Sequence, residues 1–122
     1  MIIDLPLIES RGLPTKTYIS AITLAELSQG VHFARNDEQR SARLERLQYA
    51  ESEYRNPLPF DAPAARTYGV LAGLVLQAGR SPRPRRLDLM IAAVAAVNGL
   101  PLFTRNAVDL VGIEARVKVV AV

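Results

Sequence analysis

The most hydrophobic part of the chain is residues 86–99, where one carboxylate, Asp88, stands near the front of a run of apolar side chains. Apolar residues on nearly every side of a helix are typical of a helix that is buried on several sides. Asn98 and Gly99 are residues that often end a helix. The pattern therefore predicts a buried helix with Asp88 in its first turn, where the helix dipole favours an anion.

Three amphipathic patterns predict further helices before this one. Residues 21–31 are expected to form a helix that places Glu26 close to its apolar face. Residues 36–54 carry charges of both signs around an apolar stripe, which indicates a surface helix capped by Asn36 or Asp37. Asp61 is expected to cap a third helix, with Pro63 in its first turn.

Short stretches of apolar and β-branched residues alternate with these helices. Residues 17–20, 100–104 and 117–122 are predicted strands, and residues 57–60 are a short extended segment with two prolines. Strands that alternate with helices favour a parallel sheet with right-handed crossovers. We therefore expect an α/β fold with a central parallel sheet, in a single domain that spans residues 1–122.

The composition narrows the chemistry that such a domain can support. Cysteine is absent, which excludes disulfides, thiol catalysis and cysteine zinc sites, and a single histidine, His32, excludes sites built on several histidines. The net charge of +3 and the sequence pI of about 9.7 favour polyanionic partners. Because no apolar run is long enough to span a membrane and no secretory signal opens the chain, we expect a cytoplasmic protein without a membrane partner.

Three acidic residues stand where the predicted topology would form a site. Glu26 follows the strand at 17–20, Asp88 starts the buried helix, and Asp109 follows the strand at 100–104. Sites of parallel α/β sheets lie beyond the carboxyl ends of the strands, so these carboxylates can converge from separate elements. Crowded carboxylates repel one another unless a cation neutralises them, and oxygen ligands suit Mg²⁺ or Mn²⁺, ions that promote phosphodiester hydrolysis. The alternative for Asp88 is a simple charge at the start of a helix.

Four motifs, in order along nearly the whole chain, resemble those of PIN-domain ribonucleases. ISAITLAEL at residues 19–27 resembles the segment that carries that family's second acid, and RLDLMIAA at residues 86–93 resembles the helix with its third acid. LPLFTRNAVD at residues 100–109 is similar to the family's L-x-T-x-N-x-x-D ending. Residues 57–61, followed by an alanine-rich helix, are also similar. Together the motifs resemble the toxin subunit of VapBC toxin–antitoxin pairs.

This resemblance implies a PIN-like three-layer α/β/α fold and Mg²⁺-dependent endoribonuclease activity on cellular RNA. Glu26, Asp88 and Asp109 would be its catalytic and metal-binding acids, and Thr104 and Asn106 would support them. The resemblance also implies a small VapB-like antitoxin as a partner and a homodimer. A generic nucleotide-binding domain is disfavoured because the glycine-rich phosphate motifs of that class are absent.

The opening of the chain, MIIDLPLIES, departs from that family, which starts with a central strand followed by D-T-S or D-T-N. One interpretation makes Asp4 the first acid, without the hydroxyl residue that follows it elsewhere. The other places Asp4 a few residues beyond a first strand and first acid that this chain lacks, and we favour it because it fits the motif better. The alternative function is then a catalytically impaired PIN module that binds antitoxin or RNA without cleaving it.

Four arginines precede Asp88: Arg80, Arg83, Arg85 and Arg86. Arginines beside the acids of a nuclease are suited to contacts with RNA phosphates. They are equally suited to an acidic antitoxin tail, and a solvated loop is the third interpretation. Aromatic residues make up only 6% of the chain, so the sequence indicates phosphate contacts rather than a platform for stacking bases.

Overall fold

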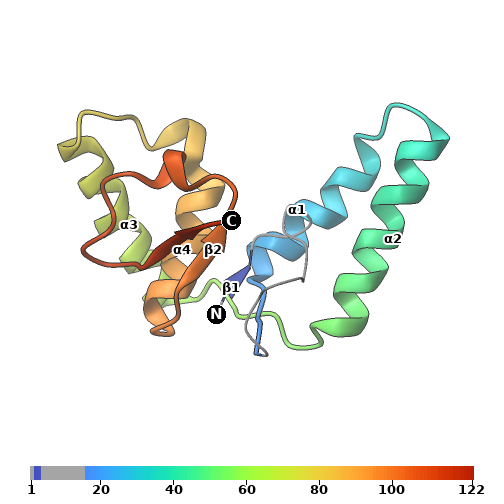
Figure 1. Cartoon of the computed structure of the whole chain (residues 1–122), viewed down its shortest axis with the longest axis horizontal. Coiled ribbons are helices and arrows are strands. Elements are labelled where there is room, and N and C mark those ends of the chain that lie inside the picture. Colours follow the sequence, from blue (N-terminus) through green and yellow to red (C-terminus); the bar gives the residue numbers. More distant parts are fainter. Residues whose placement is uncertain (1, 4–15) are drawn as a thin grey trace.

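A computed structural model describes residues 2–3 and 16–122, and helices outweigh a small sheet in these ranges. The helices are α1 (Ala21–His32), α2 (Asp37–Glu53), α3 (Ala62–Gln77) and α4 (Arg86–Val97), with 3₁₀ turns η1 (Arg83–Arg85) and η2 (Ala107–Leu110). The strands are β1 (Ile2–Ile3), β2 (Leu102–Thr104) and β3 (Val119–Ala121). Figure 1 shows α1 and α2 as an arm on one side, and α3, α4, β2 and β3 as a body on the other.

The sheet of the described residues has three parallel strands in the order β1-β2-β3. Ile2 pairs with Leu102, which pairs with Val119 on its other side, so β2 is the central strand and β1 lies at an edge. The sequence analysis favoured a chain without a first strand, and that expectation is wrong, because Ile2 and Ile3, directly before Asp4, form β1 and pair with β2. The parallel sheet predicted from the sequence is present, but its strands are so short that the fold is mostly helical rather than built on a large sheet.

Residues 17–20 do not form the regular strand that was predicted: Tyr18 and Ser20 are isolated bridge residues, and Ser20 pairs in parallel with Leu58. Backbone hydrogen bonds connect Leu58 N to Ile19 O at 2.9 Å and Ala21 N to Leu58 O at 2.8 Å. Both backbone groups of Leu58 therefore face residues 19–21, and the pairing is an isolated bridge.

The core of the body lies between α3 and α4, which pack against each other. Helix α4 buries Leu89 and residues 91–95, which confirms the prediction of a buried helix. Helix α3 contributes a stripe of Ala64, Leu71 and Val75, and it begins at the predicted cap, where the Asp61 side chain accepts a hydrogen bond from Ala64 N. Gly99 follows α4 with a φ of +64°, which suits a helix end.

The arm has a much smaller core. Its buried cluster consists of Ile19, Leu27 and Ala50, and Ala50 is the only buried residue of α2. Partly buried side chains, including Leu24 and Leu47, pack against this cluster. Helix α2 is therefore a surface helix, as predicted, and it contacts the protein chiefly through α1. None of the helices in the described ranges has the length and hydrophobicity needed to cross a membrane.

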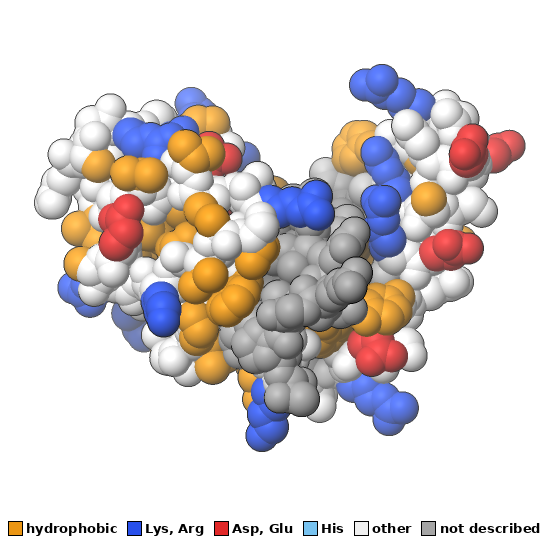
Figure 2. All heavy atoms as spheres, viewed as in Figure 1, with side chains coloured by type: hydrophobic (Ala, Val, Ile, Leu, Met, Phe, Trp, Pro, Cys, Tyr) orange, Lys and Arg blue, Asp and Glu red, His pale blue; other side chains and the backbone are white. Residues whose placement is uncertain are grey.

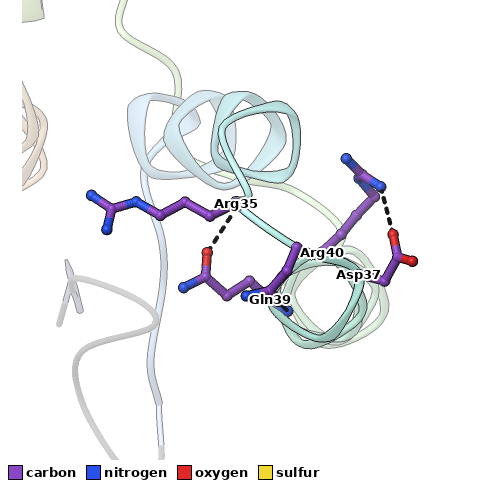
Figure 3. A network of polar contacts seen from close by, with 5 residues as sticks. Arg35, Asp37, Gln39 and Arg40 are labelled. Atoms are coloured by element: carbon purple, nitrogen blue, oxygen red, sulfur yellow. Dashed lines mark hydrogen bonds and ion pairs between the residues drawn. The ribbon is translucent and has the colours of Figure 1, made fainter.

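The start of α2 is held by side chains rather than by burial (Figure 3). The Asn36 side chain accepts a hydrogen bond from Gln39 N at 2.8 Å, and the Gln39 side chain accepts one from Arg35 N at 2.9 Å. Arg40 forms an exposed ion pair with Asp37 at 3.1 Å. Of the two predicted caps, the structure therefore selects Asn36, and Asp37 becomes the first residue of the helix.

Candidate functional site

A pocket of about 300 Å³ lies between the arm and the body. Glu26 reaches it from α1, Asp88 from the first turn of α4, and Asn106 from the turn after β2. The remaining wall is the arginine-rich segment before α4, and the full lining is Glu26, Arg83, Pro84, Arg85, Arg86, Leu87, Asp88 and Asn106. The structure thus brings two carboxylates, 62 positions apart in the sequence (88 − 26), to one pocket.

Asp88 is an acid of the pocket whose surroundings disfavour its charged form. Its side chain is half-buried, and it also borders a closely packed floor formed by Ile91, Leu102, Thr104 and Leu110. Burial raises the pKa of the Asp88 carboxyl, the negative charge of Asp109 raises this pKa further, and the Arg85 guanidinium lowers it in part. The positive charge of Arg85 therefore only partly offsets the burial of Asp88 and its repulsion by Asp109. A cation in the pocket would stabilise the ionised form of Asp88 further.

Arg85 lies among these acids. Its Nη2 is 3.9 Å from Asp109 Oδ1, and its Nη1 donates to the backbone carbonyl of Ser81. Its side chain is 16% exposed, and among the described residues the buried Nε finds no acceptor. A guanidinium that is this buried and this poorly hydrogen-bonded depends on nearby negative charge to offset its lost hydration.

The turn after β2 is fixed by one hydrogen bond to a side chain and one within the backbone. Thr104 is only 2% exposed, and its hydroxyl accepts a hydrogen bond from Asn106 N at 3.0 Å. Asn106 O in turn accepts a hydrogen bond from Asp109 N at 2.9 Å. Thr104 therefore orients the turn that presents Asn106 to the pocket and places Asp109 beside Arg85.

The structure does not gather the three predicted acids into one metal cage. Glu26 and Asp88 line the pocket, whereas Asp109 is outside its lining and pairs with Arg85. Across residues 2–3 and 16–122, no three His, Cys, Asp or Glu side chains lie close enough to hold a metal together. Asp4, the other acid considered from the sequence, lies outside the described residues. The donors that are present still fit Mg²⁺, which keeps several waters and binds through one or two carboxylates.

The four arginines divide into two groups. Arg83, Arg85 and Arg86 line the pocket, but Arg80 donates to Val108 O at 2.6 Å and braces η2 instead. Sequence reasoning treated the four alike and missed the burial of Arg85. The available signal was its position directly before the buried helix, in a segment that two prolines hold in a tight turn.

Comparison with known proteins agrees with the motifs. The PIN domain family matches residues 4–108, a range that includes Glu26, Asp88, Thr104 and Asn106 and ends one residue before Asp109. Ribonuclease VapC5 from Mycobacterium tuberculosis is 39% identical over 95 residues, which cover 77% of this chain and 67% of that protein.

Solved structures with the same fold also match along almost the whole chain. The crystal structure of VapBC-5, a member of the VapBC family of toxin–antitoxin systems from Mycobacterium tuberculosis, matches with a TM-score of 0.80 and 31% identity, over 99% of this chain and 97% of that one. FitAcB from Neisseria gonorrhoeae matches with a TM-score of 0.74 and 27% identity, over 98% and 95% of the two chains.

Proposed function

Because this chain belongs to the PIN domain family and is a VapC-type toxin of the VapBC toxin–antitoxin class, we propose that it is a metal-dependent endoribonuclease that cleaves cellular RNA. The observation that carries the proposal is the pocket in which Glu26 and Asp88 lie beside three arginines. Carboxylates next to arginines suit a cation and an RNA phosphate at the same place. Its relative from Mycobacterium tuberculosis is named a ribonuclease.

In this proposal, Glu26 and Asp88 hold the metal and Asp109 adds negative charge at the edge of the pocket. Bound Mg²⁺, or Mn²⁺ in its place, supplies activation of water and neutralisation of charge on the phosphate. Thr104 and Asn106 act as support, since the hydrogen bond between them fixes the turn beside Asp88. Asn106 presents a neutral polar group to the pocket without adding charge.

The arginines are proposed to bind the RNA backbone. Arg83 and Arg86 are exposed and line the pocket, so their guanidinium groups are available to phosphates next to the cleaved bond. Figure 2 shows that the molecule is hollowed between arm and body, with Lys and Arg side chains along the inner edge of the arm. This distribution suits an extended polyanion that lies across the hollow and passes over the pocket.

We further propose a VapB-like antitoxin and a second copy of the chain as protein partners. The solved relative VapBC-5 is described as a member of a toxin–antitoxin family.

One observation favours the second candidate, a PIN module that binds RNA or antitoxin without cleaving it. The described residues supply no third acid to the pair of Glu26 and Asp88. A pocket with fewer carboxylates holds a divalent cation less tightly, because affinity rises with ligand charge. Binding of RNA through the arginines does not depend on that cation.

The two candidates are separated by a cleavage assay with end-labelled RNA and the matching DNA sequence, in Mg²⁺, Mn²⁺ or EDTA. Glu26→Gln is expected to reduce metal-dependent RNA cleavage by about 100-fold or more, the range for loss of electrostatic stabilisation at a reaction site. Glu45→Gln, an exposed acid on α2, is the matched control and should cleave like the parent. Retention of RNA by the parent without cleavage in either metal would support the binding module instead.

A further inference from the structure

The Arg85 guanidinium already supplies a positive charge near Asp88 and Asp109, the carboxylates that a bound cation would neutralise. Asp88 and Asp109 are close enough for the charge of one to raise the pKa of the other, and Arg85 opposes that effect. The nearest atoms of Arg85 and Asp109 are 3.9 Å apart, longer than the 2.7–2.9 Å typical of a charge-assisted hydrogen bond. The interaction is thus electrostatic attraction without a direct hydrogen bond, which a stronger ligand can displace.

Arg85 is held in this position by the backbone. Its Nη1 donates to Ser81 O, in the turn that leads into η1, while its buried Nε has no acceptor among the described residues. The guanidinium therefore donates one hydrogen bond to a backbone carbonyl, and its positive charge acts on the carboxylates of Asp88 and Asp109. An arginine that served only to close the turn would not need to be desolvated beside these acids.

We propose that Arg85 is the internal counter-ion of Asp88 and Asp109, and that it sets the affinity of the pocket for a divalent cation by competing with it for these carboxylates. The inference rests on the proposed function, because it concerns the same pocket. In the metal-free protein, Arg85 reduces the repulsion between the two acids. When a cation enters, the same positive charge opposes it, so the pocket binds the cation more weakly than its carboxylates alone would.

Arg83 provides the matched comparison. It lines the same pocket and carries the same charge, but it is exposed, so solvent screens its effect. The affinity for Mn²⁺ is measured directly, without RNA, from the electron paramagnetic resonance signal of the free ion. Arg85→Met is expected to bind Mn²⁺ about tenfold more tightly than the parent, and Arg83→Met no more than about twofold more tightly.

Thermal melts and a variant that keeps the charge test whether Arg85→Met acts through folding or through charge. Thermal melts in EDTA should show a larger loss of melting temperature for Arg85→Met than for Arg83→Met, and a larger gain when Mn²⁺ is added. Arg85→Lys keeps the charge and should bind Mn²⁺ within about twofold of the parent. If Arg85→Met does not fold, this lysine variant decides: an affinity that rises as far as tenfold would overturn the proposal.

The remaining outcomes separate this inference from the proposed function. Equal changes in Arg85→Met and Arg83→Met, or weaker binding in Arg85→Met, overturn the counter-ion role while metal binding by the parent still stands. Failure of the parent and every variant to bind Mn²⁺ overturns both the counter-ion role and the metal dependence of the proposed function.

Discussion

Helix α4 of the body is 12 residues long and buries six of them, whereas α2 of the arm is 17 residues long and buries only Ala50. The body is therefore stabilised by burial of apolar surface between α3 and α4, and the arm depends on local hydrogen bonds and a small cluster against α1. Regions with few buried contacts open more readily than the rest of a protein. We expect the arm to open at a lower free energy than the body.

The pocket takes residues from both parts. Glu26 belongs to the arm, and Asp88 and Asn106 belong to the body. The distance between the two carboxylates thus depends on how α1 is held against α4, which it contacts directly. Asp88 is therefore fixed by the well-packed core of the body, whereas Glu26 is fixed by the arm, which has the smaller core.

The largest expected effect is on the body's acid. Asp88→Asn should reduce RNA cleavage by about 100-fold or more, because it removes a metal-binding charge at the reaction site. Asp37→Asn, an exposed aspartate in the first turn of α2, is the matched control and should cleave like the parent. Cleavage by Asp88→Asn at the parent's rate would show that Asp88 is only a charge at the start of a helix.

Stability in EDTA distinguishes a functional Asp88 from a structural one. Because burial raises the pKa of Asp88, the folded chain binds this proton more tightly than the unfolded chain does. The metal-free parent therefore loses stability as the pH rises from the ordinary aspartate pKa through the raised value. Asp88→Asn lacks this loss, so at neutral pH it should melt at the same temperature as the parent or higher. A much lower melting temperature would instead mean that Asp88 stabilises the fold.

The next largest effect is on stability, and it differs between the core of the body and the core of the arm. Leu71→Ala, which truncates a fully buried side chain of α3, should lower the free energy of unfolding by about 2–5 kcal/mol. Leu47→Ala, at a partly buried position in the arm, should cost about 1 kcal/mol, because less apolar area is lost. Urea denaturation followed by circular dichroism measures both. Equal losses would show that the arm is packed as well at Leu47 as the body is at Leu71, against the contrast between the two parts.

Local patterns in the sequence predicted the helices well. The caps Asn36 and Asp61, the stripe of α3 and the burial of α4 all depend on neighbours a few positions away, which the sequence shows directly. The strand at 17–20 could not be judged in this way. Its extent depends on its pairing partner, which local sequence does not identify, and the structure pairs Ser20 with Leu58 through an isolated bridge.

The site was predictable only as a set of candidates. Sequence position placed Glu26, Asp88 and Asp109 near strand or helix ends, but it could not show which of them share a pocket. That depends on side-chain direction and on Arg85, which pairs with Asp109 beside the pocket. Arg80 and Arg85 are partly buried whereas Arg83 and Arg86 are exposed, and this difference comes from tertiary packing, so the four arginines look alike in the sequence.

The smallest expected effect is at the free end of the arm. Asn36→Ala removes the acceptor of the hydrogen bond from Gln39 N, and loss of such a cap costs about 1 kcal/mol. Because α2 has so little burial to compensate, the cost should appear locally, as amide hydrogen exchange in the first turns of α2 that is about fivefold faster. Exchange in α4 should stay unchanged, since α4 belongs to the other core.

Asp37→Asn, which breaks only the exposed ion pair with Arg40, should change exchange less than the cap variant does. Faster exchange of equal size in α2 and α4 after Asn36→Ala would show that the arm and the body open together, and the contrast between them would fail.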